Sequence, residues 1–316
     1  MNNLVSQSQR SNLAHDPASP KTPISPLVDV DGNKQSLKKN DGEEEVETKM
    51  KPFDICTPKQ VGNPKQAGNL VTLKPSLFAK NREKRKEMKQ QSGKGTELRP
   101  GMVLLKGYIS LDDQIKIVKA CRELGLGQGG FYQPGYEGGT KLHLKMMCLG
   151  KNWDPQTSKY GDHRPCDDSV PPKIPDEFLK LVQSAINDSD SVTEPSKSKP
   201  FPSISPDICI VNFYAENGRL GLHQDKDESE QSIRDGLPVV SFSIGDTAEF
   251  LYGDVNDVDK AKKVLLESGD VLIFGGKSRK VFHGVAAIKK DTAPLRLFEE
   301  TNMRKPGRLN LTFRRY

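Results

Sequence analysis

The sequence predicts an α+β protein whose last third forms a β-sandwich or jelly roll. Short runs with strand-like alternation fill residues 207–316, and glycine turns separate these runs. Two helical patterns, at 111–124 and 176–186, come before them. We therefore expect a sheet-rich core that begins near residue 207 and a mixed extension on its N-terminal side.

Residues 1–97 have the composition of a disordered polar arm. Ser, Pro, Asn, Lys and Glu are frequent there and aromatic residues are few, so the segment cannot bury enough apolar surface to offset chain entropy. An acidic run lies at 41–47 and a basic run at 80–89. The basic run fits an import signal, a phosphate-contacting segment or a solvated charged helix.

The folded part is expected to start at residue 98, with an N-terminal extension over 98–206. An apolar run predicts a strand at 102–105, and Ser110 is placed to cap a helix over 111–124. The glycine-rich segment 125–130 follows this helix instead of joining a strand to one. We therefore interpret it as a loop and not as a dinucleotide site.

The segment 207–316 carries the strand pattern of the predicted core. Apolar and alternating runs predict strands at 207–214, 220–223, 238–245, 248–253, 263–267, 270–274, 281–285 and 308–314. A further strand pattern at 141–153 runs into a loop with the only tryptophan. The charged segment 295–306 is predicted to be a loop before the last strand.

His223, Asp225 and His283 form the ligand pattern of a two-histidine, one-carboxylate iron site. A His-x-Asp triplet alone is weak evidence, because such triplets occur by chance. Here, however, the triplet and the distant histidine both stand at the ends of predicted strands. Such a site leaves one face of the metal open to a keto acid and dioxygen, so we predict an Fe(II) centre.

The last predicted strand, residues 308–314, is polar on one face. Alternate residues of a strand point the same way, which groups Arg308, Asn310, Thr312 and Arg314. Buried guanidinium groups need anionic partners, and a keto diacid together with Asp225 would provide them. The alternative is a pair of exposed arginines on an edge strand.

Four motifs follow one another in the chain: Asn212-x-Tyr214, His223-x-Asp225-x-Asp227-Glu228, Ser278-Arg279 before Phe282-His283-Gly284, and Arg308-x-Asn310-x-Thr312-x-Arg314. In this order and at these spacings they resemble the motifs of the AlkB family of nucleic-acid dioxygenases, over roughly residues 100–316. The resemblance implies a double-stranded β-helix (jelly roll) core with iron bound by His223, Asp225 and His283. It implies a 2-oxoglutarate site made of Asn212, Tyr214, Arg308, Asn310 and Arg314.

The resemblance also implies that the extension 98–206 carries a lid over the nucleotide. Trp153 lies where an aromatic side chain would stack on a flipped base, with Tyr160 nearby. Asp227 would accept a hydrogen bond from an exocyclic amino group. The alternatives are a core position for Trp153 and, for Asp227, a role in orienting Arg314 or a metal ligand.

The implied reaction is oxidative demethylation with Fe(II), 2-oxoglutarate and O2, which releases formaldehyde and succinate. We predict DNA with N6-methyladenine or N1-methyladenine as the substrate, and RNA, including transfer RNA, as the close variant. Acidic and charged stretches at 246–262 and 295–306 leave room for a protein or small-molecule hydroxylase on the same iron centre. The intact metal triad and both arginines argue against a non-catalytic binding protein.

The net charge, hydropathy and cysteine content indicate the kind of partner and the cellular compartment to expect. A net charge of +6 and a pI of about 8.9 suit a polyanionic partner. No run of about 18 apolar residues predicts a membrane span, and the first residues lack the apolar core of a secretory signal. Five cysteines without CxxC spacing indicate a reducing compartment and no cysteine zinc site. We expect a monomer in the nucleus and/or cytoplasm.

Overall fold

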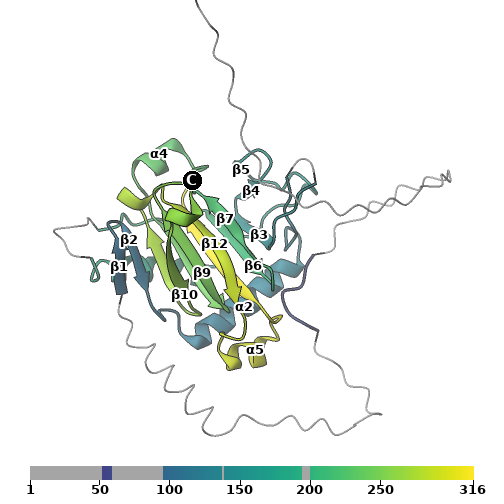
Figure 1. Cartoon of the computed structure of the whole chain (residues 1–316). Helices are drawn as coiled ribbons and strands as arrows, with labels where there is room; N and C mark the ends of the chain where they lie inside the picture. Colours follow the sequence, from purple (N-terminus) through teal and green to yellow (C-terminus); the bar gives the residue numbers. More distant parts are fainter. Residues whose placement is uncertain (1–51, 59–94, 137–138, 194–199) are drawn as a thin grey trace, which may run out of the picture. The chain divides into compact units, whose positions relative to one another are not determined.

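The main sheet has seven antiparallel strands in the order β1-β2-β11-β8-β13-β6-β3 (Figure 1). The computed structural model describes residues 52–58, 95–136, 139–193 and 200–316. The strands of the main sheet are β1 (Gly95–Arg99), β2 (Met102–Leu105), β3 (Lys145–Gly150), β6 (Ile208–Tyr214), β8 (Val239–Gly245), β11 (Val271–Phe274) and β13 (Arg308–Arg314).

A second antiparallel sheet of four strands faces the main sheet, in the order β10-β9-β12-β7. Its strands are β7 (Leu220–His223), β9 (Thr247–Gly253), β10 (Lys262–Leu266) and β12 (Phe282–Lys289). A short separate hairpin consists of β4 (Asn152–Asp154) and β5 (Lys159–Gly161). The two larger sheets form the predicted sheet-rich core, which is consistent with a jelly roll.

Two buried apolar layers flank the main sheet. Ile210 of β6 belongs to the layer between the sheets, together with Phe250 of β9. The next residue, Val211, belongs to the layer on the other face, together with Phe313 of β13 and Val182 of a covering helix. Because successive side chains of a strand point to opposite faces, a strand buried on both sides is apolar almost throughout. This is why β6 and β8 are buried along their whole length.

Helices cover the face of the main sheet that lies away from the second sheet. The helical segments are α2 (Leu111–Leu126), α3 (Asp176–Ser189), α4 (Glu230–Arg234), α5 (Leu295–Thr301), and the 3-10 turns η1 (Val258–Lys260) and η2 (Gly276–Ser278). The Ser110 hydroxyl accepts a hydrogen bond from the Asp113 amide at 3.2 Å, which confirms the predicted helix cap.

Two element predictions are corrected. The first helix continues past Gly125, where the Phe131 ring occupies the space that a side chain would need: an added Cβ would lie 2.3 Å from Phe131 Cδ2. The segment 295–306 was predicted as a loop, but α5 occupies its first half and buries Leu297 and Phe298 against the core.

The prediction that residues 1–97 are disordered is wrong for the two described segments of this range, 52–58 and 95–97. Ile55 and Cys56 are buried, with 0% and 1% of their surface exposed, in the helix-side layer. Next to them, Asp54 accepts two hydrogen bonds from the guanidinium of Arg122, at 2.9 and 2.8 Å. Strand β1 starts at Gly95, before the predicted boundary. The acidic and basic runs lie outside the described residues.

The extension and the core share one sheet. Strands β2 and β3 come from the predicted extension 98–206, yet β2 pairs with β11 and β3 pairs with β6. The predicted strand over 141–153 is shorter than expected, because β3 starts at Lys145 and Trp153 lies in β4. None of the described helices combines the length and the apolar character that crossing a membrane requires.

We expect Ile55→Ala to lower the free energy of unfolding by about 2–5 kcal/mol, because removal of this fully buried side chain leaves a cavity in the core. Urea denaturation followed by circular dichroism measures this change. Pro58→Ala is the matched control, since Pro58 is exposed in the same segment, and its effect should stay within about 1 kcal/mol. Equal stability of the two variants would show that residues 52–58 do not dock on the core.

Candidate metal centre

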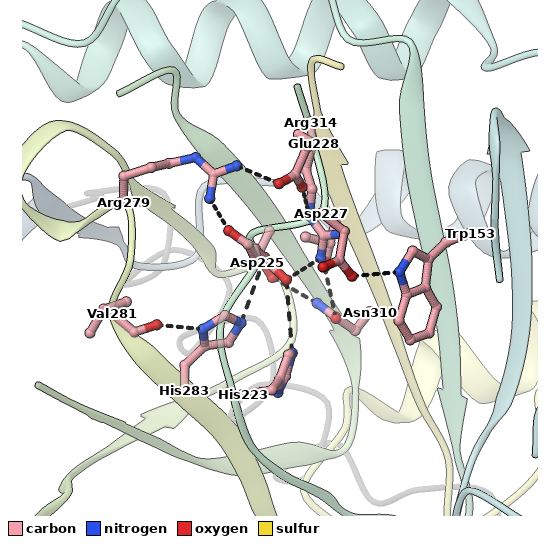
Figure 2. Close-up of polar contacts among 12 residues, drawn as sticks. Trp153, His223, Asp225, Asp227, Glu228, Arg279, Val281, His283, Asn310 and Arg314 are labelled. Carbon is pink, nitrogen blue, oxygen red and sulfur yellow. Dashed lines mark hydrogen bonds and ion pairs between the residues drawn. The ribbon is translucent and has the colours of Figure 1, made fainter. Parts of the chain in front are cut away.

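The two predicted histidine ligands face each other across neighbouring strands of the smaller sheet. His283 in β12 pairs directly with His223 at the end of β7, and their ring centroids are 4.4 Å apart. Asp225 follows β7 by two residues and points its carboxylate toward both rings (Figure 2). Its Oδ1 lies 3.8 Å from His223 Nε2, and its Oδ2 lies 3.7 Å from His283 Nε2.

Both imidazole rings are oriented by main-chain carbonyl groups. The Nδ1 of His223 lies 2.9 Å from the Gly221 carbonyl oxygen, and the Nδ1 of His283 lies 3.1 Å from that of Val281. A carbonyl oxygen only accepts hydrogen bonds, so each Nδ1 carries the proton. When either ring is neutral, its lone pair is therefore on Nε2, the atom that faces Asp225.

The environment keeps His283 and Asp225 in the protonation states that a metal requires. Burial, assisted by the nearby His223, lowers the pKa of His283 to about 4, so this ring is neutral at pH 7. Burial alone would raise the pKa of Asp225. The positive charge of Arg314, followed by His283 and His223, outweighs that effect and lowers this pKa to about 2.

The donor set fits a divalent first-row metal such as Fe(II). Ligand atoms of His223, Asp225 and His283 all lie within 4.8 Å of one another. Asp225 Oδ2 is buried without a hydrogen-bond partner, an unfavourable state that a bound cation would relieve. Two neutral imidazoles and one carboxylate on one side of a cavity are the ligands of mononuclear non-haem iron.

A pocket between the two sheets adjoins this cluster. It is lined by His223 and His283 and by all five residues predicted to bind 2-oxoglutarate, namely Asn212, Tyr214, Arg308, Asn310 and Arg314. The period-two prediction for β13 is thereby confirmed, because its polar residues face the pocket while Leu309 and Leu311 lie in the opposite layer.

Arg308 is the pocket residue best suited to an anionic ligand. It is only 1% exposed, and its guanidinium donates to neutral groups, Ser243 Oγ at 2.9 Å and the Leu266 carbonyl oxygen at 3.4 Å. Its Nε has no hydrogen-bond partner, and it forms no ion pair among the described residues. Burial lowers the pKa of Arg308 to about 10, so the group is still charged at pH 7. A carboxylate ligand would supply the missing partner.

Arg314 already has protein partners. Its NH2 group donates to Asp225 Oδ1 at 2.6 Å, and its NH1 group donates to the Tyr160 hydroxyl at 2.7 Å. The expectation that Asp225 is an anionic partner of a β13 arginine is therefore confirmed. A contact between Arg314 and 2-oxoglutarate stays a prediction.

The three predicted substrate residues lie beside the pocket. Trp153 and Tyr160 face each other as a cross-strand pair in the β4–β5 hairpin. The indole N–H of Trp153 donates to Asp227 Oδ2 at 2.9 Å (Figure 2). Asp227 thus contacts an aromatic side chain of the hairpin, whereas the sequence had suggested Arg314 or a metal ligand as its protein partner. Trp153 is half-buried and packs against the layer between the sheets. Its burial is therefore intermediate between that of an open stacking surface and that of a core residue.

Glu228 and Arg279 belong to the sequence motifs, but the sequence predicted no role for either of them. Both are buried, and they form an ion pair with 2.9 Å between Arg279 NH2 and Glu228 Oε2. Arg279 also donates to the main-chain oxygen of Asp225 (Figure 2). One sequence signal could have identified them. Each is a charged residue close in the chain to a predicted ligand: Glu228 to Asp225, and Arg279 to His283.

Comparisons with known proteins agree with this site. The sequence model of the 2OG-Fe(II) oxygenase superfamily matches residues 101–314. The DNA N(6)-methyladenine demethylase ALKBH1C of Arabidopsis thaliana is 63% identical over 251 residues, 78% of this chain and 54% of that protein. The alpha-ketoglutarate-dependent dioxygenase AlkB of Salmonella typhimurium is 31% identical over 225 residues, 69% of this chain and 91% of that protein. The solved structure of OsALKBH1 is 60% identical, with a TM-score of 0.67, and covers 70% of this chain and 100% of that one.

The chain spans only about half the length of its plant relative ALKBH1C, 54%. Residues 101–314, which match the family model, nevertheless include the metal cluster, the pocket, the second sheet and every strand of the main sheet except β1. The family and the donor set agree on the predicted cofactors, Fe(II), 2-oxoglutarate and O2. This chain therefore belongs to the 2OG-Fe(II) oxygenase superfamily, and within it to the AlkB-like dioxygenases.

Proposed function

We propose that this protein is an Fe(II)- and 2-oxoglutarate-dependent dioxygenase that demethylates N-methylated bases in DNA, of the N6-methyladenine or N1-methyladenine type. The observation that carries the proposal is the His223, Asp225 and His283 cluster at the mouth of a pocket containing an unpaired arginine. The relatives support the proposal, since they include a DNA N(6)-methyladenine demethylase and an alpha-ketoglutarate-dependent dioxygenase.

His223, Asp225 and His283 would hold the iron through two Nε2 atoms and the free Asp225 oxygen. When bound, iron, 2-oxoglutarate and O2 supply the oxidation of an N-methyl group, with formaldehyde and succinate as products. The chain contributes the geometry: two carbonyl groups fix the imidazoles, and Arg314 fixes the carboxylate. Such supporting contacts set the basicity and orientation of metal ligands.

The inner end of the pocket would hold the keto acid. Arg308 would pair with the far carboxylate of 2-oxoglutarate, which is distant from the metal. Tyr214 and Asn212 line the same end, and the buried Asn212 Oδ1 lacks a partner among the described residues. Asn310 donates to Ser241 Oγ at 2.8 Å, which orients its amide toward the cavity wall.

The β4–β5 hairpin would form part of a nucleotide lid in the 98–206 extension, with residues 207–316 as the catalytic core. Trp153 would stack on a base extruded from its strand, because chemistry on a base nitrogen requires that the base leave the helical stack. Asp227 would accept a hydrogen bond from the exocyclic amino group. Its Oδ2 already accepts one from the Trp153 indole, and its Oδ1 would take this role.

RNA, including transfer RNA, is the closest alternative substrate, because an unpaired methylated base offers the enzyme the same base atoms in RNA as in DNA. One panel tests the substrate class directly: methylated DNA and RNA oligonucleotides, a peptide mixture and 2-oxoglutarate alone, each with Fe(II), scored by formaldehyde release. Formaldehyde from a methylated DNA oligonucleotide supports the proposal. Turnover with peptides alone would favour the hydroxylase alternative.

His223→Ala should abolish formaldehyde release, because two ligands seldom retain a metal that three would bind. The variant suits the test because His223 is only half-buried and its loss leaves no buried charge unpaired. His143→Ala, at an exposed histidine outside the cluster, is the matched control and should keep full activity. Turnover by His223→Ala at the rate of the control would refute the metal assignment.

Arg308→Lys should raise the KM for 2-oxoglutarate by about tenfold or more, because an ammonium group cannot form the forked pair with a carboxylate. The kcat at saturating 2-oxoglutarate should change less. Initial rates of succinate formation across a 2-oxoglutarate series measure both parameters. Arg296→Lys, on the exposed part of α5, is the control. An unchanged KM would exclude Arg308 from the keto-acid site.

Trp153→Ala should weaken binding of a methylated oligonucleotide by about 1–3 kcal/mol, the usual value of one base–aromatic stack. It should leave substrate-free consumption of 2-oxoglutarate intact. Trp153→Phe keeps an aromatic face but loses the hydrogen bond to Asp227, so it should retain most of the affinity. Fluorescence anisotropy measures both variants. If Trp153→Phe binds as weakly as Trp153→Ala, the contact to Asp227 matters and stacking does not.

A further inference from the structure

Two buried arginines from distant parts of the chain converge on the predicted metal ligand Asp225. Arg314 of β13 holds its side chain, through the 2.6 Å contact to Oδ1. Arg279, which follows η2, donates to its main-chain oxygen (Figure 2). The ligand is therefore fixed at both its carboxylate and its backbone, and only Oδ2 stays free to face a metal.

Glu228 contacts both of these arginines. Its Oε2 lies 2.9 Å from Arg279 NH2, and its Oε1 lies 3.4 Å from Arg314 Nε. The side chain of Glu228 is fully buried, with 0% of its surface exposed. Figure 2 shows it on the side of Asp225 away from the two histidines. A carboxylate in this position cannot reach solvent, and its charge acts on the two guanidinium groups.

The charges of this group balance only when Glu228 is included. Asp225 and Glu228 carry two negative charges, and Arg279 and Arg314 carry two positive charges. Without the charge of Glu228, the other three side chains would together carry one excess positive charge. The site is poorly solvated, so electrostatic effects there are strong. Asp225 would then be the one acidic residue among the described residues that contacts these two arginines, and their excess positive charge would weaken it as a ligand for a dication.

We propose that Glu228 is a positioning residue for the metal centre: it balances Arg279 and Arg314 and so keeps Asp225 oriented and basic enough to bind the metal. Glu228 itself does not bind the metal. Its nearest nitrogen partners are the two guanidinium groups, and it lies outside the cluster of ligand atoms. This inference rests on the proposed function, since it concerns the metal of the same site.

The test is Mn(II) binding by the full-length protein, followed through the loss of the free Mn(II) electron paramagnetic resonance signal. Mn(II) accepts the same nitrogen and oxygen ligands and is stable in air. Glu228→Gln preserves the shape of the side chain and removes its charge. We expect the Kd for Mn(II) to rise by about 10- to 100-fold, the usual effect of losing a group that supports a metal ligand.

Glu230→Gln is the matched control: the same substitution at an exposed residue two positions further along the chain, at the start of α4, for which the Kd should be unchanged. The double variant Glu228→Gln with Arg279→Gln restores the charge balance, so it should bind Mn(II) more tightly than Glu228→Gln alone. A thermal melt of each apoprotein separates this effect from stability. A lowered Tm with wild-type Mn(II) affinity would mean a purely structural role and would overturn the inference.

The outcomes also separate this inference from the proposed function. If the wild type does not bind Mn(II), or binds no better than His223→Ala, the metal assignment itself fails. If the wild type binds Mn(II) and Glu228→Gln binds equally well, only the role of Glu228 is refuted. A double variant no tighter than the single one would likewise overturn the charge-balancing role.

Discussion

The direct pairing of His283 with His223 across β12 and β7 is the constraint on which the site depends. Side chains of directly paired residues lie on the same face of a sheet, so this register alone brings two imidazoles together. A slip of one residue would turn one ring to the other face. Gly284 makes the close approach feasible, because an added Cβ there would lie 2.6 Å from the Leu220 carbonyl oxygen. The predicted metal centre is therefore a consequence of strand pairing at the edge of the four-stranded sheet.

The buried arginines at and near the pocket fall into two groups: those paired with carboxylates of the protein, and Arg308, which is not. Near the metal ligands, Arg279 and Arg314 are paired with carboxylates, so their burial is compensated within the protein. Deeper in the pocket, Arg308 donates only to neutral groups among the residues that the structure describes. A buried charge without a counter-charge is costly, and folded proteins retain one where a ligand completes it. The inner end of the pocket is thus ready for an anion, while the metal end is already balanced.

The extent to which the sequence predicted the structure depends on how local each signal is. The alternation in β13 and the turn before β7 are local, and both the strands and the orientation of Arg308 were predicted correctly. Ile55 has no such pattern, since an isolated apolar pair in a polar segment is buried only through distant partners. Glu228 was missed for the same reason. Its importance comes from Arg279, which is 51 positions away in the chain and adjacent only in the fold.

The network around Asp225 also joins the metal end of the pocket to the hairpin that carries Trp153. Tyr160 accepts a hydrogen bond from Arg314, the same arginine that holds Asp225. On the other strand of the hairpin, Trp153 donates to Asp227, two residues after that ligand. A base that displaced either aromatic side chain would change the partners of the metal-binding loop. Such shared contacts are what a physical coupling between two sites requires, because each partner then has a different free energy in the two arrangements.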